Sequence, residues 1–346
     1  MENIWLYLLI LLLKMIGVVT VALLGVPVMV WVERKGSARI QQRPGPLYVG
    51  PEGIIQPIAD AIKLFLKEDI MPSAVDKPLY ILAPIMAFVP AVLTFAVIPI
   101  GPHLQVTDVN IGLLFIFAVS SMGIYGLVMA GWASNNKWSL ISALRTAAQM
   151  ISYELILGLS VIGVLMYSGS LSMQEIVKAQ EGLWLGFIPK WFVIPQFLGW
   201  ILFLVAAFAE TNRLPFDLPE AEAELVAGFH VEYSSMKFAL FFMAEYVAMI
   251  SICCVMVVLF FGGWLPLPIV GPLVESILPA FVVSYFMPIV WFLMKIGFFL
   301  FFMVWVRWTF PRLRYDQLMK LGWKVLLPLA IFNVFLAGII RMIGLT

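Results

Sequence analysis

The sequence predicts an all-α polytopic membrane protein of about eight transmembrane helices plus an amphipathic helix at the membrane surface. Composition is the first observation behind this prediction: 63% of the residues are hydrophobic and only 12% are charged, an apolar share well above that of soluble domains. The second observation is the repetition of apolar runs near the ~20 residues that a helix needs to cross a bilayer. We therefore treat residues 1–346 as a single membrane domain.

The spans and their orientation follow from the apolar runs and the loops between them. The eight segments that qualify are residues 4–32, 79–100, 111–132, 142–167, 191–209, 238–262, 281–306 and 325–345. The loops at 101–110 and 263–280 contain no Lys or Arg, whereas the segment 33–77 contains seven and the segment 307–324 contains five. Because cytoplasmic loops carry the excess of Lys and Arg, the basic loops are predicted to be cytoplasmic. An even number of spans then places both termini on the non-cytoplasmic side.

The first cytoplasmic loop, residues 33–77, contains an amphipathic helix at 54–67 that follows a loop rich in Pro and Gly. One face of this helix is apolar, with Ile54, Ile58, Ile62, Phe65 and Leu66, and the other is polar, with Gln56, Asp60, Lys63 and Lys67. The segment is too short and too charged to span, so it is predicted to lie in the interface plane. A simple connector resting on the membrane has the same pattern.

Several charged side chains fall inside or at the ends of the predicted spans. They are Lys14, Glu154, Glu245 and Lys295 inside spans, Arg145 at the start of the fourth span and Glu210 at the end of the fifth. Each charge costs about 2.5–3.5 kcal/mol at a helix centre, so each is expected to face the bundle or a hydrated cavity. A structural ion pair is one interpretation of each residue. For Glu154 and Glu245 we favour a functional one, because an unpaired carboxylate there would be protonated and able to exchange protons. For Lys14 we favour a polar contact with a neighbouring helix or subunit, and the role of Lys295 stays open.

The second cytoplasmic loop, residues 210–237, is acidic on the side of the membrane where loops are usually basic. Asp217 is predicted to cap a helix, with Glu220 three residues later as in a capping box. This explains the start of the loop and leaves Glu222, Glu224 and Glu232 without a structural reason. Clustered carboxylates near a membrane raise one another's pKa, which suits proton uptake.

Three stretches resemble signatures of the quinone-site membrane subunit of respiratory complex I, the NADH-quinone oxidoreductase or type I NADH dehydrogenase. They are "ERKGSARIQQRPGPLYVGPEGIIQPIADAIKLFLKE" at 33–68, "ALRTAAQMISYE" at 143–154 and "AETNRLPFDLPEAEAELVAGFHVEYSSMKFALFFMAEY" at 209–246. The resemblance implies a multi-pass subunit of the cell inner membrane that anchors the peripheral arm and forms the membrane-side wall of the quinone cavity. It also implies that the subunit links quinone reduction to proton translocation.

The resemblance assigns roles to matching residues. It implies that Glu33, Arg34 and Asp60 lie in the quinone cavity or at its edge, and that Asp217, Glu220, Glu222 and Glu224 form an acidic loop facing it. It further implies a polar path into the membrane made of Glu154, Glu210 and Glu245 with Arg145 and Arg213. Lys63 joins the cavity set because it lies one helical turn from Asp60.

The chain is expected to hold neither a redox centre nor a metal site, and no side chain catalytic on its own. Cys253 and Cys254 are adjacent, His103 and His230 are the only histidines, and no dinucleotide-binding glycine loop occurs. The resemblance places NADH, FMN and iron–sulfur clusters on partner subunits and quinone at this one. Its implied partners are other complex I subunits and membrane lipid, and the net charge of +1 gives no reason to expect nucleic acid.

Three other interpretations remain. A subunit of a membrane-bound hydrogenase or formate hydrogenlyase would share the fold but use no quinone. A cation/proton antiporter would explain the charges in the spans but would leave both elaborate cytoplasmic loops unused. A purely structural anchor would tolerate neutralisation of the buried acids.

Overall fold

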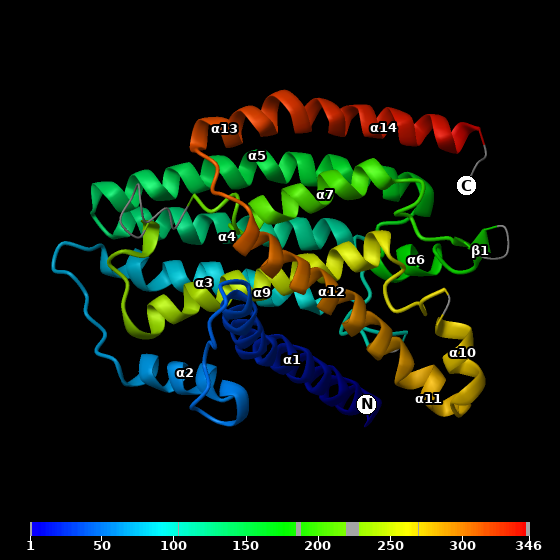
Figure 1. Ribbon diagram of the computed structural model, residues 1–346, viewed down its shortest axis with the longest axis horizontal. Coiled ribbons are helices and arrows are strands. Elements are labelled where there is room, and N and C mark those ends of the chain that lie inside the picture. The colour runs from blue at the N-terminus through cyan, green and yellow to red at the C-terminus, as the bar shows by residue number, and fades with distance from the viewer. Residues whose placement is uncertain (1, 103, 185–187, 219–227, 269, 344–346) are drawn as a thin grey trace.

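The computed structural model describes residues 2–102, 104–184, 188–218, 228–268 and 270–343, and within them the chain is a bundle of long helices (Figure 1). Seven of these helices are long and apolar enough to cross a membrane. They cover Leu8–Ile40, Lys77–Ala96, Gly112–Ala133, Lys137–Ser168, Ser235–Phe260, Met287–Thr309 and Tyr315–Met342. The remaining predicted span, residues 191–209, corresponds to a shorter apolar helix, Phe197–Glu210. The all-α polytopic fold predicted from the sequence is therefore confirmed.

The elements follow one another along the described residues in the order below. The first half contains α1 (Glu2–Ile40), η1 (Pro51–Gly53), α2 (Gln56–Leu66), α3 (Lys77–Leu93), η2 (Thr94–Ala96), α4 (Gly112–Ala133), α5 (Lys137–Ser168) and α6 (Met173–Lys178). The second half contains β1 (Leu183–Trp184), β2 (Ile188–Pro189), α7 (Phe197–Glu210), η3 (Gly228–His230), α9 (Ser235–Phe260), α10 (Val270–Ile277), α11 (Ala280–Tyr285), α12 (Met287–Thr309), α13 (Tyr315–Leu321), η4 (Gly322–Leu326) and α14 (Leu327–Met342). The strands β1 and β2 form one small antiparallel ladder.

The fifth span differs most from its prediction. Residues 192–196 form turns, and helix α7 begins only at Phe197. Its 14 residues make a helix of about 21 Å, shorter than the ~30 Å apolar core of a bilayer. Turns are tolerated at membrane depth where protein surrounds them, and Phe192 and Gln196 in this segment are both buried.

Other helix ends also move relative to the sequence prediction. Helix α1 continues to Ile40 and is about 58 Å long, so Glu33 and Arg34 lie on a helix and not in a loop. The segment 263–280, expected to be a loop, contains helix α10. Helix α1 begins and α14 ends at the end of the bundle that carries α6, α10 and α11, whereas α2 lies at the other end (Figure 1). The first and last helices therefore have their outer ends at the same end of the bundle, which agrees with an even number of membrane crossings.

Helix α9 forms the centre of the core. Its sequence is apolar all round, as expected for a helix surrounded by protein, and the eight residues from Cys253 to Phe260 are all buried. It packs against α1, α3 and α12. The outer helices have the opposite character: only 11% of the apolar window of α1 and 22% of that of the α13–α14 helix is buried within the chain. Their exposed apolar faces suit lipid or neighbouring subunits.

Candidate functional site

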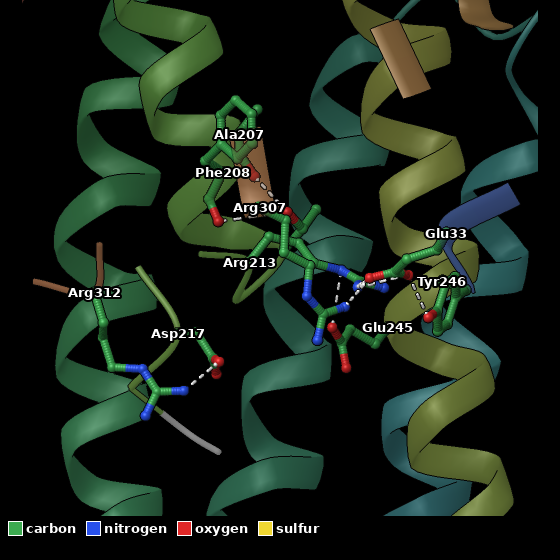
Figure 2. A network of polar contacts seen from close by, with 10 residues as sticks. Glu33, Ala207, Phe208, Arg213, Asp217, Glu245, Tyr246, Arg307 and Arg312 are labelled. Carbon is green, nitrogen blue, oxygen red and sulfur yellow. Dashed lines mark hydrogen bonds and ion pairs between the residues drawn. The ribbon is translucent and has the colours of Figure 1, made fainter. Parts of the chain in front are cut away.

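A cluster of buried and half-buried charged residues lies where α1, α9 and α12 meet the segment that follows α7 (Figure 2). At its centre, Arg213 Nη1 donates hydrogen bonds to both carboxylate oxygens of Glu33, at 3.2 Å each. The Tyr246 hydroxyl donates to Glu33 Oε2 at 2.6 Å, and Arg307 donates to Glu33 Oε1. Glu33 and Arg213 are only 5% and 3% exposed, so this carboxylate keeps its charge in the interior through two guanidinium groups and a phenol.

Arg213 also reaches Glu245, which makes it the bridge of the cluster. Its Nε lies 3.0 Å from Glu245 Oε1, and its guanidinium carbon lies 4.3 Å from the centre of the Tyr246 ring. Burial alone would lower the pKa of Arg213, but the carboxylates of Glu245 and Glu33 outweigh it and raise that pKa above its usual value. The guanidinium is therefore permanently charged. We call Glu33, Arg213, Glu245, Tyr246 and Arg307 the charge cluster.

The end of α7 fixes Arg213 in place. The backbone N–H of Arg213 donates to the carbonyl of Phe208 at 3.1 Å, and the Thr211 hydroxyl donates to the carbonyl of Ala207 at 2.9 Å. Asn212 between them has a φ of 50°, a left-handed conformation that Asn adopts more readily than most residues. The chain thus reverses sharply after α7 and directs the arginine inward.

The functional interpretation of Glu245 depended on an unpaired carboxylate, and the structure instead pairs Glu245 with Arg213. Arg213 lies 32 positions before Glu245 and 180 positions after Glu33, and neither helical spacing nor a motif links the three. A structural ion pair, the other interpretation of a charged residue in a span, describes Glu245. The sequence also did not indicate Tyr246 as a partner, and Arg307 counted only as a topological signal.

Asp217 forms a second ion pair beside the cluster. Arg312 Nη2 donates to Asp217 Oδ2 at 2.8 Å (Figure 2), and Asp217 is buried whereas the Arg312 side chain is 31% exposed. Asp217 thus has an arginine partner that its predicted role as a helix cap did not include. The predicted helix start itself, with Glu220, Glu222 and Glu224, lies outside the described residues.

A cavity of about 120 Å³ lies between α3, α4, α5, α7 and α9. Its ionisable lining residues are Glu154 from α5, Glu210 from α7, His230 from η3 and Glu245 from α9. Smaller polar groups line it as well, namely Thr94, Ser120, Thr211, Asn212 and Ser251, and the remaining wall is mainly apolar. The volume holds several water molecules, and the polar groups are numerous enough to bind them.

Glu210 exposes an uncompensated carboxylate oxygen to this cavity. Its Oε2 atom is buried without a hydrogen-bond partner among the described residues. Buried polar atoms in this condition generally bind water, and the cavity supplies the space. Glu154, Glu210 and Glu245 line this one cavity, and Glu245 also belongs to the charge cluster.

The remaining predicted site residues lie outside both the cluster and the cavity. Arg34 pairs with Asp60 of α2, and Lys63 lies 3.6 Å from the same carboxylate. Partial burial would raise the pKa of Asp60, but hydrogen bonds from Arg34 and Gln56 hold it below its usual value. Arg145 contacts the face of the Tyr315 ring at 5.6 Å. Arg34 and Asp60 thus form a separate, more exposed group on α1 and α2.

The two lysines inside spans have structural partners. Lys14 donates to the carbonyl of Gln105 at 3.3 Å, in the connection between η2 and α4, whereas a neighbouring helix or subunit was expected. Lys295 donates to the carbonyls of Phe261, Gly263 and Leu265 at 2.7–3.0 Å. These carbonyls follow the C-terminus of α9, where a cation is favoured by the helix dipole. Lys295 therefore ties α12 to the end of α9.

Comparison with known proteins places the chain in a family. The family model for NADH dehydrogenase matches residues 13–338. The chain is 48% identical to an H-type NADH-quinone oxidoreductase subunit of Koribacter versatilis, over 98% of this chain and 99% of that protein. It is 51% identical to NADH-ubiquinone oxidoreductase chain 1 of Chondrus crispus, over 95% and 96%. It is 46% identical to the H-type NADH-quinone oxidoreductase subunit of Rhodospirillum rubrum, over 95% and 93%. With matches over nearly its whole length, the chain belongs to the NADH dehydrogenase family.

Proposed function

We propose that this chain is the membrane subunit of a proton-translocating NADH-quinone oxidoreductase that forms the membrane-side wall of the quinone cavity. We further propose that it links quinone reduction to proton movement. The relatives' names, which are those of quinone and ubiquinone oxidoreductase subunits, support the proposal. They favour it over a hydrogenase subunit, a cation/proton antiporter or a purely structural anchor.

The observation that carries the coupling role is the double position of Glu245. It pairs with Arg213 in the charge cluster and lines the cavity that also contains Glu154 and Glu210. A change of charge near Glu33 or Arg213 alters the electrostatic environment of Glu245 directly, because Arg213 contacts both acids and Glu33 and Arg213 are themselves buried. The protonation of the cavity acids can then follow an event at the cluster. Arg145, on the same helix as Glu154, is proposed to belong to the same path.

The quinone side is proposed to lie at the α2 end of the bundle. Its residues are Glu33, Arg34, Asp60, Lys63, Asp217 and Glu220, and the acids Glu222 and Glu224 are proposed to pass its protonation changes to Glu210. Support comes from the ion pair that ties α1 to α2 through Arg34 and Asp60 and from the burial of Asp217 beside the cluster. Reduction of quinone to quinol takes up two electrons and two protons, so carboxylates beside the headgroup experience a charge change at each turnover.

Electrons are proposed to arrive from partner subunits that carry NADH, FMN and iron–sulfur clusters. In this chain Cys253 and Cys254 are adjacent and both buried, and two such thiols do not supply the four thiolates of a common cluster. The chain's own part is then to bind quinone, to hold charges and to move protons. Its proposed place is the cell inner membrane, in contact with lipid and other complex subunits, with both termini on the non-cytoplasmic side.

The test is Glu210→Gln in the assembled complex, with Glu175→Gln as the matched control. Glu175 is an exposed glutamate paired with Lys178 on α6, a helix at the end of the bundle opposite α2 (Figure 1). In inverted membrane vesicles, Glu210→Gln is expected to lower quinone-linked proton pumping at least about tenfold, a lower bound on the about 10²–10⁴-fold contribution of an acid–base group. Electron transfer from NADH to an artificial acceptor should stay at the level of the control. Normal pumping in Glu210→Gln would show that the cavity acids have only a structural role.

A further inference from the structure

Gln149 is a fully buried glutamine on helix α5. Its amide nitrogen donates hydrogen bonds to two backbone carbonyls, those of Ala209 and Phe216, at 2.8 Å each. Because the nitrogen of an amide donates and its oxygen does not, the two carbonyls fix the orientation of the side chain. Ala209 lies four positions before Arg213 and Phe216 three positions after it. One side chain therefore contacts the segment of Arg213 on both sides of the arginine.

Two hydrogen-bonded turns meet at Arg213. Its N–H donates to the carbonyl of Phe208 at 3.1 Å, and its carbonyl accepts from the N–H of Phe216 at 2.8 Å. Ala209 belongs to the last turn of α7, where carbonyls have no partner within the helix. Gln149 thus joins the end of α7 to the second turn and attaches both of them to α5.

The contacts of the Arg213 guanidinium depend on where this backbone lies. Nη1 is 3.2 Å from each carboxylate oxygen of Glu33, and Nε is 3.0 Å from Glu245 Oε1. These distances lie in the upper part of the range for a good hydrogen bond, and a shift of about 1 Å would take any of them out of it. A group that fixes the backbone on both sides of Arg213 therefore also fixes how the arginine divides its contacts between the two acids.

We propose that Gln149 is the positioning residue of the charge cluster, because it holds both ends of the reversal from Ala209 to Phe216 from which Arg213 reaches Glu33 and Glu245. This inference rests on the proposed function and adds the residue that holds the arginine between the cluster and the cavity. Gln149 acts through Arg213 and takes no part in proton exchange itself, since its amide is not a titrating group.

The competing role is stability alone, and the chain offers a matched control for it. Gln180 is also buried and lies just after α6, at the end of the bundle opposite α2 (Figure 1). It makes four hydrogen bonds to backbone groups, namely those of Ile176, Phe192, Val258 and Gly262. Replacement of Gln180 by methionine therefore removes at least as many buried hydrogen bonds as the same replacement of Gln149, but leaves the backbone around Arg213 alone.

The first experiment measures proton pumping of the whole complex in inverted vesicles, with electron transfer to an artificial acceptor as the measure of assembled enzyme. Gln149→Met is expected to pump at least about tenfold less per assembled complex, within the about 10²-fold effect that a misplacement of 1 Å can have at a functional site. Gln180→Met is expected to lower the amount of complex and leave pumping per complex unchanged. Equal pumping per complex in these two variants overturns the proposal.

The second experiment is a double-mutant cycle on the thermal stability of the assembled complex. If Gln149 acts through Arg213, Glu245→Gln already removes part of what Gln149 maintains, so the midpoint shift of the double variant is smaller than the sum of the two single shifts. The control cycle pairs Gln180→Met with Glu245→Gln. Val258, a partner of Gln180, follows Glu245 by 13 residues on α9, about 20 Å along the helix, and shifts at such a distance should add. Additive shifts in the Gln149 cycle contradict a role through Arg213.

A milder variant keeps the test decisive if Gln149→Met does not assemble. Gln149→Asn keeps the amide on a side chain that is one methylene shorter, and its pumping per complex is expected to lie between those of Gln149→Met and the natural protein; natural pumping in Gln149→Asn would then overturn the proposal. Failure of the proposed function gives a different pattern. If Glu210→Gln pumps normally, the proposed function is wrong, whereas the cycle with Glu245→Gln still tests whether Gln149 positions Arg213.

Discussion

The charge cluster and the cavity are adjacent and both contain acidic side chains, but they differ in how far the negative charges are balanced by positive ones. In the cluster, the carboxylates of Glu33 and Glu245 face the guanidinium groups of Arg213 and Arg307, so two negative charges meet two positive ones. In the cavity, Glu210 has a carboxylate oxygen with no partner among the described residues. A fully paired carboxylate keeps its charge, whereas a carboxylate open only to a small water space can change it. The first arrangement suits a fixed electrostatic reference and the second suits proton exchange.

Glu245 joins the two regions and shows what their contact achieves. It is the one acid that both pairs with Arg213 and lines the cavity among the residues that the structure describes. When Glu245 takes up a proton it loses its negative charge, and its ion pair with Arg213 weakens. Arg213 then interacts more strongly with Glu33. Proton occupancy of the cavity and charge in the cluster are therefore linked through one guanidinium. The linkage is reciprocal, as any coupling between two equilibria must be.

The largest effect is expected for Arg213→Met, which tests whether the charge cluster is a structural unit. Removal of this guanidinium leaves Glu33 and Glu245 buried with less compensation, and breaking a buried pair in this way costs about 3–5 kcal/mol. We expect little assembled complex in membranes, measured as NADH oxidation with an artificial acceptor and by the amount of the chain. Lys178→Met is the matched control, because its ion pair with Glu175 is more than half exposed and such pairs contribute about 0–1 kcal/mol. Equal levels of the two variants would contradict the view that the cluster is a structural unit.

The sequence predicted the apolar framework of this protein well, because each span is a local property of about twenty neighbouring residues. Helix α2 was also predicted, from its apolar and polar faces. The predicted bounds were 54–67 and the observed helix is Gln56–Leu66. The pairing of Arg213 with Glu33 and Glu245 was not, since it depends on three segments brought together by packing. The break before α7 was also missed, because residues 191–196 are nearly as apolar as a span, although Pro195 disfavours a helix in the residues before it. Lys295 shows the same limit, as its partners are backbone carbonyls that any sequence has.

The second prediction concerns pH and the base at the edge of the cavity. Burial lowers the pKa of His230 to about 4, against about 6.5 in the unfolded chain. Between these values the unfolded chain binds more protons than the folded one, so stability falls as pH falls from 6.5 to 4 and changes no further below that window through this group. The full loss is up to about 3 kcal/mol. His230→Gln should remove this part of the acid sensitivity, measured as the difference in thermal inactivation midpoint of the complex between pH 7 and pH 5. An unchanged difference would show that the imidazole is already ionised or well hydrated in the folded protein.

The smallest expected effect is the difference in stability between Glu245→Gln and Glu210→Gln. The two variants make the same chemical change, but Glu245 belongs to both the charge cluster and the cavity, whereas Glu210 belongs to the cavity alone. Glutamine at 245 loses the charge that attracts Arg213, and a hydrogen bond to a charged group is worth about 1.5–3 kcal/mol. Glutamine at 210 replaces a carboxylate whose Oε2 has no partner in the described part of the chain, so its cost should be near zero and its sign can even be favourable. The thermal inactivation midpoint, read with an artificial acceptor so that pumping does not enter, should therefore fall for Glu245→Gln and stay in place for Glu210→Gln. Both variants should still lose quinone-linked pumping, because both remove a proton-exchanging group from the cavity. If the two thermal inactivation midpoints change equally, the ion pair with Arg213 contributes no stability, and the cluster and the cavity are one electrostatic region. If only the midpoint of Glu245→Gln falls, Glu245 stabilises the cluster and also exchanges protons in the cavity.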